Sequence, residues 1–394
     1  MTRALVVGAG LSGLATAWYL IEAGVPVHIV DARGQPGGLI RTHRTPEGLV
    51  ETGANAFLRN ERVDRLFRTL NLTPVFPQPS SRRRYIFRNG RPRRWPLTVR
   101  GTAVAASRLA ASWLTRQLST QADETVAAWG RRVVGAGATT WLIAPALQGI
   151  YAAPADVLSA RAVFGHRRGP MRLIAPAGGM GQLIERLMET LDRRGATCEW
   201  NRPVTVLDPG RLTVLAVPAP AAASLLSKHA PRLAEAIAQV RMTSLLTVTA
   251  FFEPHPHDLR GFGVLFPRSE GVNALGVLFN NEVFPGRSTL RSETWIYGSA
   301  FSGPLPADVE ILDAVVRDRA TLTGQRAAPT ASYPTRWPDA LPVYDFAVLD
   351  VARQRAELPP WLGVSGNYFG RLGATHLLEL AEETAARLTR HCRT

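Results

Sequence analysis

Residues Val6–Asp31 read VVGAGLSGLATAWYLIEAGVPVHIVD, and this stretch decides the fold of the chain. The mostly apolar run RALVV (Arg3–Val7) is typical of a strand that is buried on both faces of a parallel sheet. A glycine-rich turn then leads into a predicted helix over Leu11–Ala23, and Gly24 is its stop signal. The segment VHIV (Val27–Val30) predicts a second strand. This order of elements predicts an α/β fold of the Rossmann type.

Three glycines in that turn fit the pattern G-x-G-x-x-G, and each has its own physical role. Gly8 permits the tight turn, Gly10 lets a pyrophosphate approach the backbone, and Gly13 lets the helix pack closely against the strand. Asp31, roughly 20 residues beyond the glycines, can accept hydrogen bonds from a ribose, while the helix directs its N-terminal N–H groups at the phosphates. We therefore predict a dinucleotide site formed by Gly8, Ala9, Gly10, Leu11, Ser12, Gly13, Asp31, Ala32 and Arg33.

The residues after Asp31 distinguish FAD from NAD, which the first motif does not. The pair Gly37–Gly38, followed by IRT and ETGANAF, resembles the extended FAD signature of the flavin amine oxidase and protoporphyrinogen oxidase superfamily. By this resemblance the glycine pair lies against the cofactor phosphates, and the third segment passes near the isoalloxazine. The alternative is two surface turns joined by a hairpin. The resemblance adds Gly37, Gly38, Leu39, Arg41, Gly53, Ala54, Asn55 and Ala56 to the predicted cofactor site.

Two later blocks extend the resemblance to the protoporphyrinogen oxidase family over most of the chain. IAPALQGIYAAPADVLSARAVF is similar to the family's block after its helical region, and GNYFGRLGATHLLELA resembles its closing flavin motif. In the family, the last helix directs its N-terminus at the flavin, where it can stabilise negative charge. The chain departs from the family at Gln35, at Thr375–His376 and in a short segment between Val204 and Val214. The resemblance also assigns Val204, Gly366, Asn367, Leu372 and Ala374 to the cofactor site.

The resemblance implies an enzyme that binds FAD without a covalent bond and oxidises a porphyrinogen, most directly protoporphyrinogen IX, in haem biosynthesis. It further implies hydride transfer to the flavin N5 and oxygen as the electron acceptor. No catalytic side chain can be assigned. Arg84 in RRRYIF matches a family arginine that holds a substrate propionate, which a guanidinium can grip at two points. Asn55 would face the substrate beside the flavin. The alternatives are a solvated basic hairpin for Arg84 and a backbone role for Asn55.

Other functions stay open at this point. Coproporphyrinogen III differs from protoporphyrinogen in its number of carboxylates, and a flavin-dependent isoprenoid desaturase shares the N-terminal signature. A non-catalytic flavin-binding or tetrapyrrole-binding relative is compatible with the shortened middle segment. Many amine oxidases carry a lysine in the strand that corresponds to SLLTVTAFFE. Here that position falls near Leu246, and the only lysine of the chain is Lys228.

The pattern of the chain predicts three units. A discontinuous FAD-binding domain comprises residues 1–75, 176–235 and 355–394, because strand, glycine loop and helix return near the C-terminus. An antiparallel-sheet substrate domain comprises residues 76–96 and 236–354, with a hairpin turn at Asn89–Gly90. Residues 97–175 form a helical insert rich in alanine, leucine, tryptophan and arginine.

The net charge of the chain indicates which classes of partner it can bind. The 394 residues carry a formal net charge of +15, which suits acidic small molecules or anionic lipid surfaces, although a preference for arginine codons would also produce it. In the insert, VRGTAVAASRLAASWLTRQL mixes apolar residues with arginines. This favours either a face on an anionic membrane or an ordinary packed helix. We expect no nucleic-acid partner, and the oligomeric state is not predicted.

Cysteine content and hydropathy favour a cytosolic protein, peripheral at most on the inner face of the cytoplasmic membrane. Cys198 and Cys392 are too few for a disulfide framework. The first strand begins at once without a signal peptide, and no apolar run has the length of about 18 residues that a spanning helix needs. The pair His255 and His257 lacks a third ligand nearby, so no metal site is expected.

Overall fold

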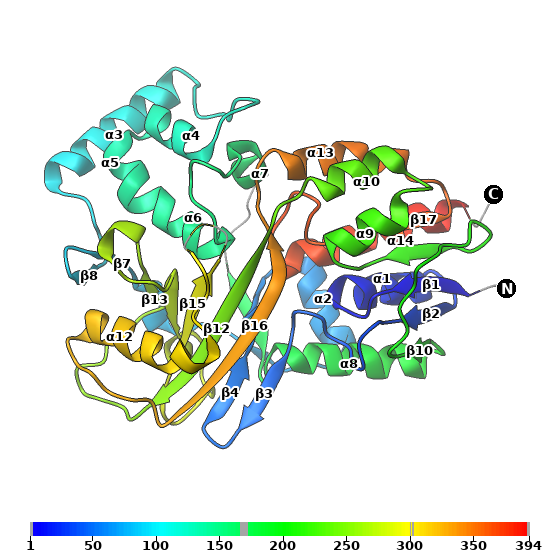
Figure 1. Cartoon of the computed structure of the whole chain (residues 1–394), viewed down its shortest axis with the longest axis horizontal. Helices are drawn as coiled ribbons and strands as arrows, with labels where there is room; N and C mark the ends of the chain where they lie inside the picture. The colour runs from blue at the N-terminus through cyan, green and yellow to red at the C-terminus, as the bar shows by residue number, and fades with distance from the viewer. Residues whose placement is uncertain (1–2, 166–171, 300, 302, 392–394) are drawn as a thin grey trace.

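The computed structural model describes residues 3–165, 172–299, 301 and 303–391, and it confirms the predicted α/β class. A nucleotide-binding half with a parallel sheet lies at the right of Figure 1, an antiparallel sheet lies at the lower left, and a helical arm rises above it.

The parallel sheet has five strands in the order β10-β2-β1-β11-β17, and all of its pairings are parallel. Its strands come from three separate parts of the chain. They are β1 (Ala4–Val7), β2 (Val27–Val30), β10 (Thr197–Glu199), β11 (Thr213–Leu215) and β17 (Leu362–Val364).

Helices cover both faces of this sheet because alternate residues of each strand point to opposite sides. Val6 and Ile29 join one apolar core, whereas Val7 and Val30 join another. The first core is closed by α1 (Leu11–Glu22), α2 (Glu61–Thr69), α8 (Met180–Arg193) and α14 (Ala374–His391). The second is closed by α9 (Ala219–Leu226), α10 (Pro231–Ala238) and α13 (Ala347–Gln354). Val348 and Val351 of α13 thus pack in the core of the nucleotide-binding half, although the sequence assigned residues 347–354 to the substrate unit.

The second sheet has seven strands in the order β16-β12-β15-β14-β13-β7-β8, antiparallel except for the pair β13–β7. Asn89 (φ 54°) and Gly90 (φ 71°) form the tight turn between β7 and β8, as their left-handed preference predicts. One face of the sheet packs on α12 (Ile311–Thr323). The strands are β7 (Arg84–Arg88), β8 (Arg91–Arg93), β12 (Met242–Phe252), β13 (Gly263–Leu265), β14 (Gly276–Phe279), β15 (Arg291–Gly298) and β16 (Ala331–Pro342).

Short elements join the two sheets. A hairpin, β3 (Thr42–Thr45) and β4 (Gly48–Glu51), lies beside a small sheet in the order β5-β9-β6. The small sheet and the remaining turns are β5 (Phe57–Leu58), β6 (Pro74–Val75), β9 (Leu173–Pro176), η1 (Pro79–Arg82), η3 (Arg268–Glu270), α11 (Asn280–Val283), η4 (Asp308–Glu310) and η5 (Arg355–Glu357).

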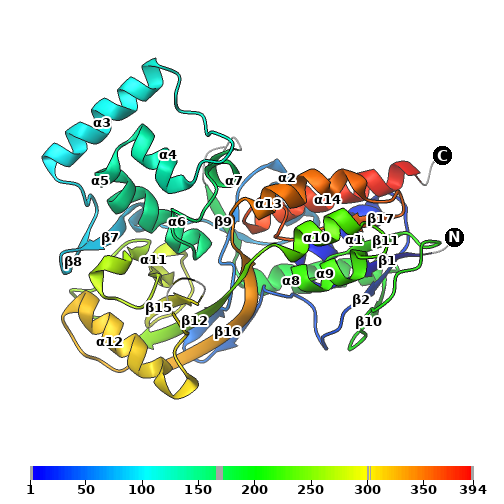
Figure 2. The same ribbon diagram turned by 45° about the horizontal axis from the view of Figure 1, so that its top comes forward.

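Residues 97–164 of the predicted helical insert form the arm, which projects from the rest of the molecule in Figure 2. Of the rest of the predicted range 97–175, residues 166–171 lie outside the described residues, and residues 173–175 belong to β9 instead. Its inner helices contribute to the second core of the nucleotide-binding half, for example through Val126 and Tyr151. The outer helix α3 buries only Ser112 among its residues. The helices are α3 (Val99–Leu114), α4 (Val126–Val133), α5 (Ala136–Ala138), the π-turn η2 (Thr139–Ile143), α6 (Ala144–Tyr151) and α7 (Ala160–Phe164).

Candidate cofactor and substrate site

Two of the three motif glycines are required by the packing of the protein itself. Gly8 has a φ of +103°, and a Cβ atom there would lie 2.3 Å from the carbonyl oxygen of Ala216. A Cβ atom on Gly13 would lie 1.8 Å from the carbonyl oxygen of Gly8. Real Cβ contacts essentially never come so close. A side chain at Gly8 would displace the backbone at Ala216, and one at Gly13 would push α1 away from the turn at Gly8.

Gly10 differs, because the protein leaves space beside it. The nearest atom to a Cβ built there is the Cα of Gly38, at 3.8 Å. The second glycine pair is held next to this turn by a hydrogen bond from the Gly37 N–H to the Ala9 carbonyl, at 2.8 Å. Two stretches of backbone without side chains thus face each other, and they form a cradle that a Cβ atom on Gly10 would begin to fill.

The N-terminus of α1 opens into this cradle without a protein cap. No side chain caps Gly10, and the first turn has no acidic residue. The N–H groups of Leu11, Ser12 and Gly13 have no acceptor in the described part of the chain. Together with the helix dipole, these free donors suit the pyrophosphate of a dinucleotide.

Asp31 lies at the rim of the cradle. Its Oδ2 accepts a hydrogen bond from the Ala9 N–H, and its Oδ1 accepts one from the Arg33 N–H, both at 2.7 Å. These bonds fix the carboxylate against the glycine turn, and each oxygen keeps a second lone pair for a ribose hydroxyl. Contact of Asp31 with a ribose stays a prediction.

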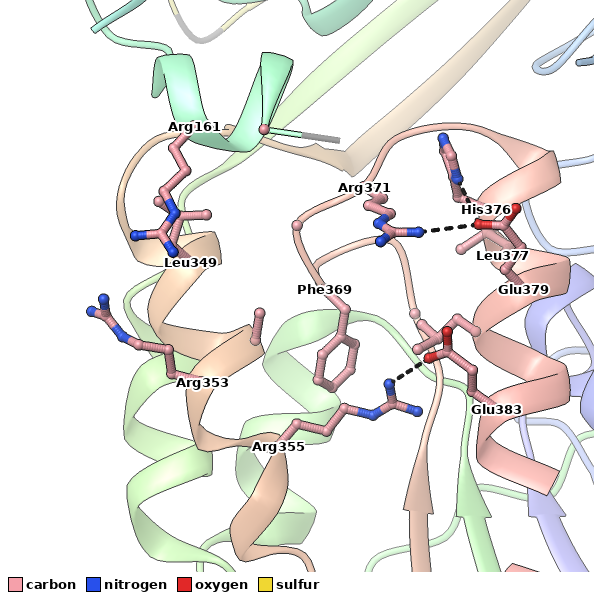
Figure 3. A pocket seen from close by; sticks show the side chains of 15 residues that line it. Arg161, Leu349, Arg353, Arg355, Phe369, Arg371, His376, Leu377, Glu379 and Glu383 are labelled. Carbon is pink, nitrogen blue, oxygen red and sulfur yellow. Dashed lines mark hydrogen bonds and ion pairs between the residues drawn. The ribbon is translucent and has the colours of Figure 1, made fainter. Parts of the chain in front are cut away.

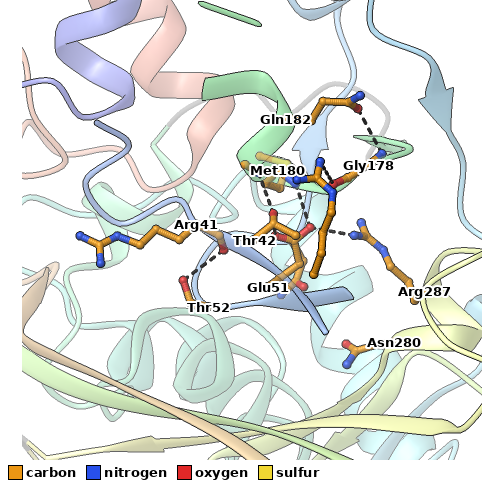
Figure 4. Close-up of polar contacts among 12 residues, drawn as sticks. Arg41, Thr42, Glu51, Thr52, Gly178, Met180, Gln182, Asn280 and Arg287 are labelled. Atoms are coloured by element: carbon orange, nitrogen blue, oxygen red, sulfur yellow. Dashed lines mark hydrogen bonds and ion pairs between the residues drawn. The ribbon is translucent and has the colours of Figure 1, made fainter. Parts of the chain in front are cut away.

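Arg41 has a buried donor that the protein does not satisfy. Its Nε atom is buried and lacks a hydrogen-bond partner. Burial lowers the pKa of Arg41, the nearby charge of Arg33 lowers it further, and Asp31 acts in the opposite direction. In Figure 4 the guanidinium points away from the other polar contacts. Because an unpaired buried donor is costly, this partly buried cation fits an anionic ligand such as a flavin dinucleotide.

Glu51 connects three parts of the molecule, and the sequence analysis missed it (Figure 4). Its Oε1 accepts hydrogen bonds from the Met180 N–H (2.8 Å) and from Arg287 Nη1 (2.7 Å), and its Oε2 accepts one from Thr42 Oγ1 (2.6 Å). The side chains of Glu51 and Arg287 are both only 4% exposed. This buried ion pair ties residues 51–56, which we call the cofactor segment, to α8 and to the antiparallel sheet unit. A lone acidic residue within ETGANAF offered no local signal for it.

The carbonyl oxygen of Thr52 joins the cofactor segment to the antiparallel sheet. It accepts hydrogen bonds from Trp337 Nε1 (2.7 Å) and from Thr247 Oγ1 (2.9 Å). On the other side, a Cβ atom on Gly53 would lie 2.2 Å from the Leu39 carbonyl oxygen. The predicted segments 37–41 and 53–56 are therefore packed against each other and held against β12 and β16.

Strand register shows which face of the seven-stranded sheet looks toward this segment. Paired residues on neighbouring strands point to the same side. Following the pairs across the sheet places Trp337, Leu245, Thr247, Ile296, Leu265, Ile86 and, two residues away, Arg84 on one face. We call this the site face. The opposite face carries Leu246, Trp295 and Phe87, which are buried in the core against α12.

Arg84 lies at the far end of the site face and is exposed. Its guanidinium stacks over the ring of Phe262, at 4.7 Å from the centroid. Phe262 and Ala56 pack against the same small apolar cluster, so Arg84 and the Asn55–Ala56 segment lie in one region of the molecule. Asn55 is partly buried, and its Nδ2 reaches the Gly53 carbonyl at 3.3 Å. The contacts of Arg84 and Asn55 with a substrate stay predictions.

The closing motif is anchored by aromatic residues. The Asn367 carbonyl accepts a hydrogen bond from Tyr344 Oη at 2.6 Å, and Tyr368 Oη donates to the Val217 carbonyl at 3.3 Å. At the start of α14, Thr375 Oγ1 accepts from the Leu58 N–H (2.8 Å) and donates to its carbonyl (2.9 Å). The threonine that departs from the family pattern thus ties α14 to β5.

The predicted cofactor residues divide into three groups in space. Gly8–Gly13, Asp31–Arg33 and Gly37–Arg41 surround the glycine turn, and Gly53–Ala56 follow beside the site face. The loop from Gly366 to Ala374 approaches from β17. Val204 lies outside any strand, between β10 and β11, and packs against the second core. Contact of each residue with the cofactor stays a prediction.

The residues near Leu246 do not supply the lysine typical of amine oxidases. Leu246 itself is buried in the core on the face away from the site. The neighbouring Leu245 and Thr247 occupy the site face instead, and Lys228 is exposed between α9 and α10. Among the described residues, no group of three or more histidine, cysteine, aspartate or glutamate side chains is arranged to hold a metal ion.

The parallel sheet, its glycine cradle and the adjoining antiparallel sheet form a frame that fits a flavin dinucleotide. The family described as flavin containing amine oxidoreductase matches residues 11–369, and the chain belongs to this family. The protein is therefore an FAD-dependent oxidoreductase.

Curated relatives cover nearly the whole chain at low identity. The chain is 26% identical to the chloroplastic protoporphyrinogen oxidase of Oryza sativa subsp. japonica, over 98% of this chain and 88% of that protein. It is 24% identical to the coproporphyrinogen III oxidase of Propionibacterium freudenreichii, over 97% of this chain and 89% of that protein.

Solved structures share the fold. A candidate protoporphyrinogen oxidase from Exiguobacterium sp. 255-15 superposes with a TM-score of 0.86 at 19% identity, covering 99% of each chain. A UDP-galactopyranose mutase superposes with a TM-score of 0.78 at 14% identity, covering 98% of this chain and 95% of the other. In the described part of the chain, every helix is too short or too polar to cross a membrane.

Proposed function

We propose that the protein oxidises a porphyrinogen to a porphyrin, with protoporphyrinogen IX as the first candidate and oxygen as the final electron acceptor. The site face carries this proposal. It offers an apolar wall that begins at the Thr52 carbonyl beside the cofactor segment and ends at the exposed cation Arg84. A porphyrinogen has the matching chemistry, because it combines a broad apolar macrocycle with carboxylates at its rim.

The side chains have separate tasks in this proposal. Trp337, Leu245 and Ile296 exclude water and position the macrocycle. Arg84 holds a propionate at the rim of the ring by charge-assisted hydrogen bonds during each hydride transfer. When bound, FAD supplies the hydride acceptor at N5.

The stoichiometry places a further demand on the site. Aromatising the macrocycle removes six electrons, so three two-electron cycles are needed and a different carbon must face the flavin in some of them. An apolar wall restrains a ring less tightly than a set of directed hydrogen bonds. We assign no general base, because none of the residues that define the site face has a carboxylate or imidazole side chain.

Anaerobic mixing tests the proposal directly. The holoprotein is mixed with protoporphyrinogen IX or with coproporphyrinogen III while flavin absorbance and porphyrin fluorescence are followed. We expect bleaching of the flavin and appearance of the porphyrin with at least one of them. Bleaching by a polyamine or a carotenoid precursor, with neither porphyrinogen active, would overturn the proposal.

Coproporphyrinogen III is the second candidate substrate. The relative from Propionibacterium freudenreichii is named coproporphyrinogen III oxidase, and its 24% identity to this chain is close to the 26% of the Oryza sativa protoporphyrinogen oxidase. A comparison of kcat/KM for the two porphyrinogens decides between them.

We also propose that the arm binds an anionic membrane surface from the cytoplasmic side without crossing it. Exposed apolar side chains gather on and before α3: Trp95 (56%), Val99 (90%), Trp113 (67%) and Leu114 (72%). They are interspersed with Arg100, Arg108 and Arg116 in the sequence. Apolar and cationic groups together suit the interface between headgroups and acyl chains.

A further inference from the structure

A second hollow lies away from the cradle and the site face. A pocket of about 420 Å³ opens between α7, α13, α14 and the loop 366–371 (Figure 3). Of the predicted cofactor residues, Gly366 alone is among the described residues that line it, and neither Arg84 nor Asn55 is among them. The pocket is therefore distinct from the proposed substrate region.

The pocket carries positive charge that its own acids do not neutralise. Four arginines and two glutamates line it. The glutamates lie on α14 and are already paired, Glu379 with Arg371 (3.2 Å) and Glu383 with Arg355 (3.1 Å). The remaining two arginines lie on α7 and α13, on the side of the pocket opposite α14 in Figure 3, where Arg353 extends outward from its helix.

These two arginines, Arg161 and Arg353, are available to a ligand. Both are exposed. Arg161 makes no ion pair with a described residue, and Arg353 pairs only with Asp350, one turn earlier on its own helix. In Figure 3, Arg161 reaches down from α7 toward Leu349, on the same side of the pocket as Arg353. Two guanidinium groups on one wall can share an acid group.

The floor of the pocket is apolar. Phe369 is 9% exposed, and Leu349, Leu377 and Leu380 also line the cavity. The Arg355 guanidinium lies 5.7 Å from the Phe369 ring centroid, within the range of a cation–π contact. An inorganic ion would leave this apolar surface unused, whereas pockets of roughly 300–1,000 Å³ typically hold whole organic ligands.

We propose that this pocket is a binding site for an amphipathic organic anion. Its acid group lies between Arg161 and Arg353, and its ring-sized apolar body rests on Phe369 and Leu377. This site does not depend on the proposed porphyrinogen oxidation.

The test uses 8-anilinonaphthalene-1-sulfonate, an aromatic anion whose fluorescence rises in apolar surroundings, and the FAD-loaded protein. We expect saturable binding that weakens about ten-fold or more in the double variant Arg161→Gln/Arg353→Gln, because charge-assisted hydrogen bonds are lost. The control variant is Arg82→Gln/Arg83→Gln, which removes the same charge from exposed positions outside the pocket. It should bind as the parent protein does.

Two further probes separate the head from the body. N-phenyl-1-naphthylamine has the same aromatic body without the sulfonate, and sulfate has the head without the body. We expect both to bind more weakly than the complete anion. Equal affinity of the parent protein and the Arg161→Gln/Arg353→Gln variant would overturn the proposal. So would loss of binding in Arg84→Ala, which would place the probe in the substrate region instead, or binding of sulfate as tight as that of the whole anion.

Discussion

The glycine cradle and the site face differ in the kind of contact that builds them. In the cradle, backbone meets backbone: Cβ atoms on Gly8 and Gly13 would fall 2.3 and 1.8 Å from carbonyl oxygens. On the site face, side chains from strands far apart in sequence share one side of a sheet, and Arg84 at its end is exposed. The difference teaches that Gly8 and Gly13 tolerate no added atom, whereas the site face can exchange side chains without losing the fold.

Gly13→Ala should have the largest effect, because its methyl group would overlap the Gly8 carbonyl oxygen. We expect loss of more than about 4 kcal/mol of stability, which is exceptional for a point mutation, and little folded protein. Urea unfolding followed by circular dichroism measures it.

Gly10→Val is the matched control for that variant. Its Cβ has no close protein neighbour, since the nearest atom is 3.8 Å away. The protein should fold but lose FAD, which release of flavin on denaturation quantifies. Normal FAD content in Gly10→Val would mean that the cradle does not hold the cofactor.

Glu51→Ala should come next, since it links the two regions. It leaves Arg287 as an uncompensated buried charge and removes the acceptor of the Met180 N–H. Removing one partner of a buried pair costs about 3–5 kcal/mol. Thermal or urea unfolding checks this value.

The control for Glu51 is Arg202→Ala. Arg202 forms an ion pair with Glu199 at the same 2.7 Å distance as the Glu51–Arg287 pair, but with side chains 64% and 43% exposed. It should change stability by less than about 1 kcal/mol. Equal effects of the two substitutions would contradict the assignment of Glu51 as a structural link.

Arg84→Ala should leave the fold and the FAD content unchanged but weaken substrate binding. Loss of one charge-assisted hydrogen bond corresponds to about 1.5–3 kcal/mol, or roughly ten- to a hundred-fold in kcat/KM, mostly through KM. Steady-state kinetics with the porphyrinogen measures the loss.

Two neighbours sharpen this prediction. Arg84→Lys should recover only part of the activity, because an ammonium group keeps the charge without the two-point grip. Arg82→Ala, an exposed arginine in η1, should behave as the parent protein does. Unchanged kinetics in Arg84→Ala would show that the carboxylate is held elsewhere.

Trp113→Ser/Leu114→Ser should have the smallest effect on stability, because these side chains are 67% and 72% exposed. We expect a change within about 0.5 kcal/mol for each. Co-sedimentation with phosphatidylglycerol vesicles at low salt should nevertheless fall. If the parent protein does not sediment with the vesicles, the membrane proposal is wrong.

The sequence by itself determined the cradle, the hairpin at Asn89–Gly90 and the class of both sheets. These features depend on neighbours in the chain. Gly8, Gly10, Gly13 and Asp31 act within one strand–helix–strand unit, so their spacing alone carries the geometry.

Only the tertiary structure decided which distant residues meet. Glu51 and Arg287 form an ion pair although they are 236 residues apart in the sequence. The Thr52 carbonyl accepts a hydrogen bond from Trp337, which is 285 residues away. Register added a second uncertainty, because a shift of one residue turns a side chain to the other face of a sheet. The sequence pattern indicated the neighbourhood of Leu246, yet the pairing of β12 buries Leu246 and presents Leu245 and Thr247 to the site. Local spacing could not reveal these contacts, because they form only when separate strands have paired and packed.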